Sequence, residues 1–333
     1  MSQISTQVLL NLLDPRVESL PPPPPPEKDF RNRLDGVVIP VWAGDVYLAK
    51  ACCASVRQSM GDIPITLLVD GRATDTRELE RLAGVRRMVV QDVVSEEEAR
   101  LCAGTPWTKM LLFWISPYER FLCLDADLLV WGDLRAYAEF DKYDFMVTHR
   151  FHNSVKFERP EQLLGCVSNV DIFKQLDPAL DWRGQEEDNT GVFFARRGIF
   201  SKENLMALRR MDCWTCFESG VFRYLHWKAL HEGNPRTIGH KLQLFPADQT
   251  SGPEDRFLPR RGQPLAVIHW ITKKPKLGRR YRAFDDYRKL FLKMTGRTKW
   301  LDARLFLEDV SVWFQRQRRS LSRRWQRIKK TSP

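Results

Sequence analysis

The chain has 333 residues and a hydrophobic content of 43%, which is enough for a packed core and excludes an intrinsically disordered protein. Its formal net charge of +11 is concentrated at one end, because residues 311–333 hold eight Lys or Arg residues and no Asp or Glu. Most of the chain is therefore only mildly basic, and the overall charge by itself identifies no partner.

The seven cysteines are scattered rather than grouped as a disulfide framework, which indicates a reducing compartment. The first 20 residues lack the basic start of a signal peptide. No stretch approaches the roughly 18 apolar residues of a membrane span. We therefore expect a cytoplasmic protein, either free in solution or peripheral on the cytoplasmic face of a membrane.

Residues 1–34 are expected to form a flexible tail ending in a linker, because the six prolines from Pro21 to Pro26 favour an extended polyproline II form. A regular alternation of elements then begins. We predict strands at 37–41, 65–71, 87–93 and 121–124, and helices at 48–60, 74–84 and 106–115. Apolar strands that alternate with helices indicate an α/β fold with a mostly parallel sheet, covered by helices on both faces.

The second half is less regular, with predicted strands at 143–147, 191–196 and 265–269. From about Asp302 the pattern predicts one long amphipathic helix, and we treat 301–333 as a separate basic segment. Its apolar positions are Leu305, Phe306, Val310, Trp313, Phe314, Leu321, Trp325 and Ile328. This face suits either an anionic membrane surface, through residues 311–333, or the protein's own core. Nucleic acid is a weaker alternative, because no recognition motif accompanies the charge.

The stretch FLCLDADLLVWGDL, residues 121–134, places Asp125 and Asp127 directly after an apolar strand. In an open α/β sheet, ligands gather beyond the carboxyl ends of the strands. Carboxylates spaced i and i+2 can both turn toward one hard cation, and the small Ala126 leaves room for a ligand. The alternative is a plain turn that carries two solvated aspartates.

Five motifs in chain order resemble blocks of the glycogenin-like glycosyltransferases, the family 8 enzymes with the GT-A fold. The longest runs from WTKMLLFWISPYERF through the DAD motif to WGDL. The others are GDVY (44–47), DNTGVFF (188–194), ADQ (247–249) and VIHWITKKP (267–275). The resemblance implies a GT-A domain over 35–300 that transfers a sugar, with retention, from a nucleotide-sugar donor, most simply a UDP-sugar. The acceptor would be a saccharide, a lipid-linked molecule or a protein.

The resemblance also implies roles for individual residues. The ligands of a Mn²⁺ or Mg²⁺ ion would be Asp125, Asp127 and His269. Contacts to the donor nucleotide would come from Val41, Trp42, Tyr47, Lys109, Ala126 and Lys274. The pocket for the transferred sugar and the acceptor would involve Lys109, Asp188, Asn189, Asp248 and Gln249. If the enzyme were inverting instead, the base would be one of Glu186, Glu187, Asp188 and Asp248.

Two departures and two alternatives remain. Thr272 stands where the family has Gly, and the segment from His269 to Lys274 is one residue shorter than in the family, which leaves open whether Lys273 or Lys274 meets the phosphate. A sugar-phosphate nucleotidyltransferase is the alternative enzyme, but PVWAGDVY supplies no Gly-rich loop after the first strand. A non-catalytic sugar-binding or scaffold protein is the alternative outside enzymes, and the intact Asp125, Asp127 and Lys109 argue against it.

Overall fold

The computed structural model describes residues 33–150, 156–163, 167–211, 213–215, 218–233, 236–244, 267–270 and 282–331. The predicted polyproline tail lies outside these residues, as do Asp248, Gln249, Thr272, Lys273 and Lys274.

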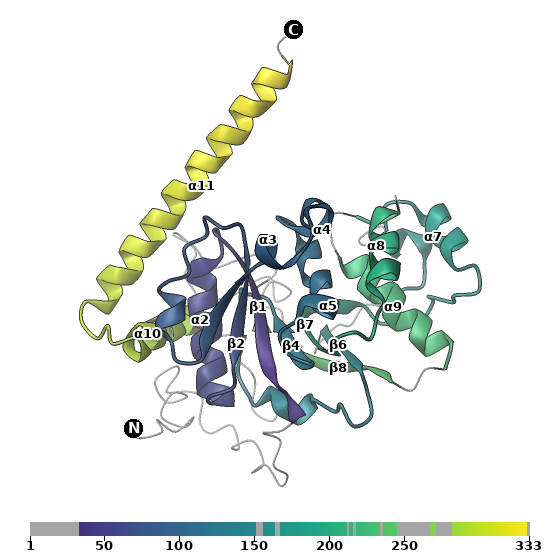
Figure 1. Ribbon diagram of the computed structural model, residues 1–333, viewed down its shortest axis with the longest axis horizontal. Coiled ribbons are helices and arrows are strands. Elements are labelled where there is room, and N and C mark those ends of the chain that lie inside the picture. The colour runs from purple at the N-terminus through teal and green to yellow at the C-terminus, as the bar shows by residue number, and fades with distance from the viewer. Residues whose placement is uncertain are drawn as a thin grey trace.

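One mixed sheet of nine strands runs through the described part of the chain, in the order β3-β2-β1-β4-β7-β6-β8-β9-β5 (Figure 1). The first half is parallel as predicted: β3, β2, β1 and β4 run the same way. In the second half β7 is antiparallel to β4 and β6, and β5 is antiparallel to β9, so the sheet is mixed there. The strands are β1 Gly36–Trp42, β2 Ile65–Asp70, β3 Val85–Val89, β4 Arg120–Leu124, β5 Leu128–Val130, β6 Phe145–Arg150, β7 Asp188–Arg196, β8 Thr237–Leu244 and β9 Val267–His269.

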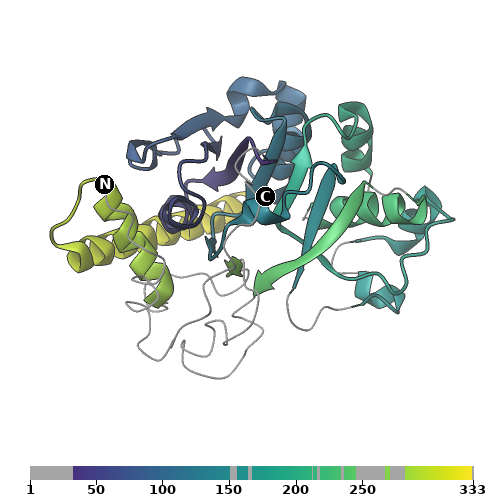
Figure 2. The same ribbon diagram turned by 90° about the horizontal axis from the view of Figure 1, so that it is seen from below.

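Helices cover both faces of the sheet, which confirms the predicted α/β fold. One face packs against α2 and α10, and the other packs against α5, α9 and a 3-10 segment, η3. Figures 1 and 2 show α10 and α11 at the opposite end of the molecule from α7 and α9. The helices are α2 Val46–Met60, α3 Val90–Val93, α4 Glu96–Cys102, α5 Leu112–Ile115, α6 Pro160–Leu163, α7 Val170–Leu176, α8 Lys202–Arg210, α9 Ser219–His231, α10 Arg282–Met294 and α11 Leu301–Thr331, with 3-10 segments η2 Leu79–Arg81, η3 Pro106–Leu111 and η4 Leu134–Tyr137.

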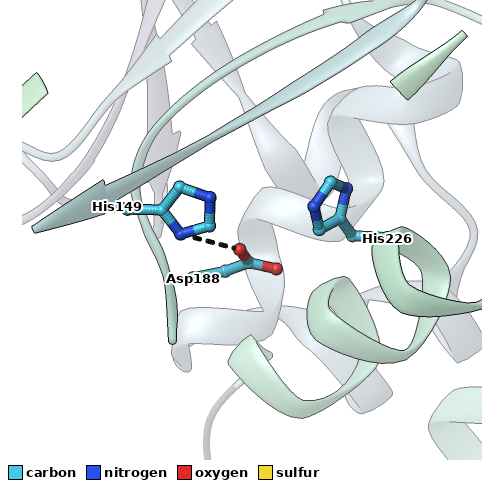
Figure 3. Close-up of side chains that lie close together, drawn as sticks. All are labelled: His149, Asp188 and His226. Carbon is cyan, nitrogen blue, oxygen red and sulfur yellow. Dashed lines mark ion pairs between the residues drawn. The ribbon is translucent and has the colours of Figure 1, made fainter. Parts of the chain in front are cut away.

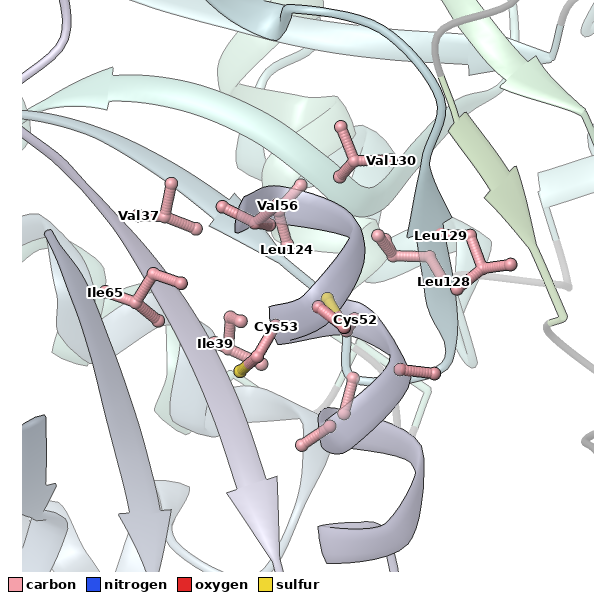
Figure 4. Packing of buried hydrophobic residues seen from close by; sticks show 14 of the residues in the cluster. Val37, Ile39, Cys52, Cys53, Val56, Ile65, Leu124, Leu128, Leu129 and Val130 are labelled. Atoms are coloured by element: carbon pink, nitrogen blue, oxygen red, sulfur yellow. The ribbon is translucent and has the colours of Figure 1, made fainter. Parts of the chain in front are cut away.

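Helix α2 fills the space inside the curved sheet. Figure 4 shows its Cys52, Cys53 and Val56 between the side chains of β1 and β2 on one side and those of β5 on the other. Ser55 and Ser59 of α2 also hydrogen-bond the backbone N and O of Val130. Strand β5 packs on α2 and pairs with β9, so the sheet curls around α2. The connection between β4 and β5 therefore lies beside the end of β9. This curl brings residues 125–127 next to His269.

Three predicted elements differ from the structure. The helix expected over 74–84 is reduced to η2. Leu79 and Leu82 are the apolar side chains of this segment that are buried, and a single 3-10 turn suffices for their i, i+3 spacing. The strand expected over 87–93 ends at Val89, and the chain turns into α3. The helix expected over 106–115 is η3 followed by α5.

The long C-terminal helix is confirmed, but its predicted apolar face is divided. Leu305 is buried against the body, whereas Phe306, Trp313 and Phe314 are 54%, 43% and 56% exposed. Beyond its first turns α11 projects away from the rest of the molecule (Figure 1). Among the described residues, no helix combines the length and the apolar character that crossing a membrane requires.

Candidate active site

The structure brings Asp125, Asp127 and His269 together at the carboxyl end of β4. Strand β4 ends at Leu124 and β5 begins at Leu128, so the three residues DAD form the connection between them. Pairing of β5 with β9 sets Leu128 opposite His269. His269 Nε2 lies 3.3 Å from Asp127 Oδ1 and 3.7 Å from Asp125 Oδ2. One ligand atom from each residue lies within 4.8 Å of the others.

The orientation of His269 suits a metal ligand. Its Nδ1 donates to Gln243 Oε1 over 2.8 Å, since the Gln243 amide nitrogen donates to the backbone O of Asn189 at 3.2 Å and to the Thr148 hydroxyl. In the neutral imidazole this chain of hydrogen bonds places the proton on Nδ1, so that the lone pair of Nε2 faces the carboxylates. The Nε2 lone pair and the carboxylate oxygens repel one another unless a cation lies between them. Two carboxylates with one imidazole therefore fit a Mn²⁺ or Mg²⁺ ion.

Gly191 on β7 makes room for the imidazole. A Cβ atom at this position would lie 2.1 Å from His269 Cε1 and 2.6 Å from Nδ1, which no real contact allows. The neighbouring Asn189 turns its Oδ1 to the backbone N of Gly191, at 2.9 Å. The Asn-Thr-Gly step of the predicted motif therefore shapes the wall of the cluster of Asp125, Asp127 and His269, and it places Asn189 beside that cluster.

Lys109 is buried between two carboxylates. Its Nζ lies 2.8 Å from Asp125 Oδ1 and 2.9 Å from Glu218 Oε1, and it donates to the backbone O of Thr190. Burial alone would lower the pKa of Lys109, but the charges of Asp125 and Glu218 outweigh it and raise that pKa. The side chain is therefore a fixed positive charge at the edge of the cluster.

Asp188 does not join this cluster. It lies with His149 and His226, two buried histidines on β6 and α9 (Figure 3). The contacts of β7 explain the difference, because Asp188 and Thr190 meet residues of α9 and the segment before it, whereas Gly191 meets His269.

The residues expected at the nucleotide lie at the end of β1 and the start of α2. Val41 and Tyr47 are buried, and the Arg288 guanidinium stands 5.7 Å from the centre of the Tyr47 ring. Trp42 is 43% exposed, and its indole N–H donates to Asp45. Tyr47 lines a cavity of about 680 Å³ between α2 and α11, but Asp125, Asp127 and His269 do not. Ala126 is buried between the two aspartates.

Sequence reasoning missed Gln243, Glu218 and Thr190. Gln243 lies on β8, a strand whose mixed polar and apolar sequence TIGHKLQL gives no clear period. Glu218 precedes α9 and accepts from the Thr190 hydroxyl over 2.6 Å. No local signal marks Gln243 or Glu218, because each contacts a side chain that is distant in the sequence.

Comparison with known proteins rests on structure alone, since no family model matches the chain and a search of curated proteins finds no match. The bifunctional glycosyltransferase WbbM aligns with a TM-score of 0.51 and 10% identity, over 80% of this chain and 52% of that one. The glycosyltransferase GlyE of Streptococcus pneumoniae TIGR4 aligns with a TM-score of 0.50 and 14% identity, over 78% of this chain and 63% of that one. This chain thus spans between half and two thirds of each structure.

These alignments show that the chain has the fold of GT-A glycosyltransferases. The galactosyltransferase LgtC, solved with donor and acceptor sugar analogs, aligns with a TM-score of 0.44 and 17% identity, over 78% of this chain and 95% of that one. At these identities the likeness extends to the fold, and the chemistry has to be argued from the residues of this chain.

Proposed function

We propose that the chain is a metal-dependent glycosyltransferase that moves a sugar from a nucleotide-sugar donor to an acceptor hydroxyl. The observation that carries the proposal is the cluster of Asp125, Asp127 and His269 at the carboxyl end of β4, with the Lys109 ammonium beside it. This is the edge of the sheet at which α/β folds bind their ligands.

A divalent cation bound by these three residues would offset the negative charge that develops on the departing nucleoside diphosphate. The residues of the chain prepare for that charge before the donor arrives. Gln243 fixes the tautomer of His269, Gly191 admits its ring, and Asp125 and Glu218 keep Lys109 charged. Preorganised charges of this kind stabilise a transition state more than the ground state.

In the transfer itself, the bond between the anomeric carbon and the phosphate oxygen breaks, and the phosphate oxygen keeps the electron pair. The acceptor oxygen forms the new bond to the same carbon, and its proton passes to the departing phosphate oxygen. We propose retention of configuration and a UDP-linked donor, both from the family resemblance. Asn189, next to Gly191, would contact the transferred sugar. Asp248 and Gln249 would complete the sugar pocket, Lys274 would meet the diphosphate, and Val41, Trp42 and Tyr47 would meet the base and ribose.

A donor panel tests this function. The full chain is incubated with Mn²⁺ or Mg²⁺ and a set of UDP-, GDP-, ADP- and CMP-linked sugars, and release of the free nucleotide is measured. Metal-dependent hydrolysis of at least one donor is the expected result. Release of pyrophosphate from a nucleoside triphosphate and a sugar phosphate would identify a nucleotidyltransferase instead. Binding without turnover would identify a sugar-binding protein.

We further propose that α11 rests on an anionic membrane surface, near a saccharide, lipid-linked or protein acceptor. Phe306, Leu307, Trp313 and Phe314 are 54%, 65%, 43% and 56% exposed, and the helix continues into a segment rich in Arg. Aromatic side chains next to cationic ones suit the interface of an anionic bilayer.

Flotation of the full chain with vesicles of neutral and anionic lipid tests the membrane contact. Binding to anionic vesicles only, reduced at least tenfold by Trp313→Ala with Phe314→Ala, is the expected outcome. The control is Trp300→Ala. Trp300 is 80% exposed, but it precedes α11 and lies outside the group of Phe306, Leu307, Trp313 and Phe314. Equal flotation of the wild type and the double variant would contradict the proposal.

A further inference from the structure

A second cluster of metal-ligating side chains lies apart from the candidate active site. It consists of His149 at the end of β6, Asp188 at the start of β7 and His226 in α9. These residues are 7%, 0% and 3% exposed. Strand pairing sets His149 opposite Asp188, and Figure 3 shows His226 facing both from the helix.

The distances suit coordination of one ion. Asp188 Oδ1 lies 3.2 Å from His149 Nδ1, and one ligand atom of each residue lies within 4.8 Å of the others. Zn²⁺ binds nitrogen and oxygen at about 2.0–2.2 Å in a tetrahedron, which separates the ligand atoms by about 3.3–3.5 Å. The separation of 3.2 Å between His149 and Asp188 is close to this value, and the ligand atom of His226 lies within 4.8 Å of both.

The environment of the Asp188 carboxylate also points to a bound cation. Both of its carboxylate oxygens are buried, and neither accepts a hydrogen bond. A buried carboxylate without donors is costly unless it is protonated or bound to a cation. Burial raises the pKa of Asp188 well above its usual value, although the nearby Arg223 opposes this.

The two histidines are oriented as metal ligands are. The Nδ1 of His226 is held by the Thr237 hydroxyl at 2.8 Å, and its other ring nitrogen faces the cluster in Figure 3. The ring of His149 fits only because position 239 is Gly, where a Cβ would lie 1.8 Å from His149 Nε2. Its Nδ1 also lies 3.3 Å from the backbone O of Glu187, which can hold the proton when no ion is bound. The Thr237 contact is an outer contact of the kind that fixes ligand orientation in metal sites, whereas the Glu187 contact is made by the ligating nitrogen of His149 and would be replaced by the ion.

The surrounding charges are nearly balanced. Arg223 lies 3.0 Å from Glu187, and Lys241 lies 3.0 Å from Glu186, so each nearby cation has an acidic partner. No cation of these two pairs is left without an acidic partner to oppose a divalent ion, and the Asp188 carboxylate becomes its charged ligand when the ion binds.

We propose that His149, Asp188 and His226 form a second, buried site for a divalent transition metal of the zinc type. Two imidazoles and one carboxylate favour Zn²⁺ over Mg²⁺ or Mn²⁺. The cluster of Asp125, Asp127 and His269 has two carboxylates and one imidazole, which suits Mg²⁺ or Mn²⁺ better. The ion would join β6, β7 and α9 directly before Asn189, and so would hold the wall of the sugar pocket. The site depends on its own three residues and stands whether or not the chain transfers a sugar.

Zn²⁺ binding by the full chain tests the site in an Asp125→Asn, Asp127→Asn background, which removes the first cluster. Competition with a chromophoric chelator should show one tightly held Zn²⁺ per chain. Co²⁺ in place of Zn²⁺ should give the visible absorption of a four-coordinate site. The proposal is wrong if this background holds no stoichiometric Zn²⁺. In this measurement His149, Asp188 and His226 are all unchanged, so misfolding of a ligand variant cannot cause the result.

Ligand variants in the same background locate the ion. His226→Gln should weaken Zn²⁺ binding at least about 100-fold, since even outer contacts of a metal site contribute 10–100-fold. The matched control is His231→Gln, because His231 is an exposed histidine on the same helix and should leave binding unchanged. Loss of the ion in the His231 variant, or its retention in the His226 variant, would show that the ion lies elsewhere. Circular dichroism establishes that each variant is folded.

Discussion

His269 Nδ1 donates a hydrogen bond to Gln243 Oε1 over 2.8 Å, and this bond directs the opposite ring nitrogen toward Asp125 and Asp127. The Gln243 amide nitrogen is in turn held by Thr148 and the backbone of Asn189. A buried amide on β8 thus decides which nitrogen of His269 can bind a cation. Four strands that are distant in the sequence contribute to this arrangement.

The first prediction concerns this amide. Gln243→Met removes the acceptor of the His269 N–H while keeping the size of the side chain. We expect the Mn²⁺ concentration for half-maximal donor hydrolysis to rise about 10–100-fold, as for other outer contacts of metal ligands. Activity should recover at saturating Mn²⁺. A variant with unchanged metal dependence would show that Gln243 does not orient His269.

The second prediction concerns Gly191. Gly191→Ala places a methyl group where His269 now lies, at 2.1 Å from Cε1. The ring has to move, so we expect loss of metal affinity together with a destabilisation of about 1–3 kcal/mol, as for other overpacked sites. Isothermal titration with Mn²⁺ and a denaturant melt measure the two effects. Wild-type Mn²⁺ affinity in this variant would contradict the proposed geometry.

The third prediction concerns Lys109. Lys109→Met leaves the Asp125 and Glu218 carboxylates without their shared cation, and we expect about 3–5 kcal/mol of destabilisation, as when a buried ion pair loses one partner. Lys202→Met is the matched control, because Lys202 is 45% exposed in its pair with Glu98 and should cost about 0–1 kcal/mol. Equal stabilities of the two variants in urea would refute the role of Lys109.

The fourth prediction concerns pH and the attachment of α11. Glu308 pairs with Lys50 and Arg288; burial alone would raise the pKa of Glu308, but these cations lower it below the ordinary 4.5. A depressed folded-state pKa contributes stability above the unfolded value, and this stability is lost as the pH falls through the folded value. Glu308→Gln should therefore be less stable than wild type at pH 7, and the difference should shrink below about pH 4.

Urea unfolding of both proteins from pH 7 to pH 3 measures this difference. Asp302→Asn serves as control on the same helix, because Asp302 is 79% exposed in its pair with Lys289. Its stability should follow that of wild type at every pH. A pH-independent difference between wild type and Glu308→Gln would mean that the charge of Glu308 does not hold α11.

The sequence was sufficient for the features that depend on local patterns. The apolar strands β1, β2 and β4 and the pair Asp125 and Asp127 follow from residues that are neighbours in the chain. His269, more than a hundred residues away, came from the family resemblance, and the structure places it with the two aspartates.

The missed features depend on contacts between distant segments. Strand β8 and Gln243 escaped prediction because the strand lies between β6 and β9, and the buried Gln243 binds other side chains rather than solvent. The cluster of His149, Asp188 and His226 likewise forms only when β6, β7 and α9 meet. In the segment 74–84 the helical pattern was present, but packing needed a single turn.

The central claim is tested most directly by metal-dependent turnover of the donor in Asp127→Asn. With the nucleotide sugar that the wild type hydrolyses, we expect this variant to lose at least about 100-fold of the Mn²⁺-dependent rate, comparable with the loss of one preorganised group at other active sites. Asp92→Asn, a change in a surface pair with Arg72, should retain the wild-type rate. Donor turnover that survives in Asp127→Asn, or that persists in the wild type after chelation of the metal, would contradict the proposed active site.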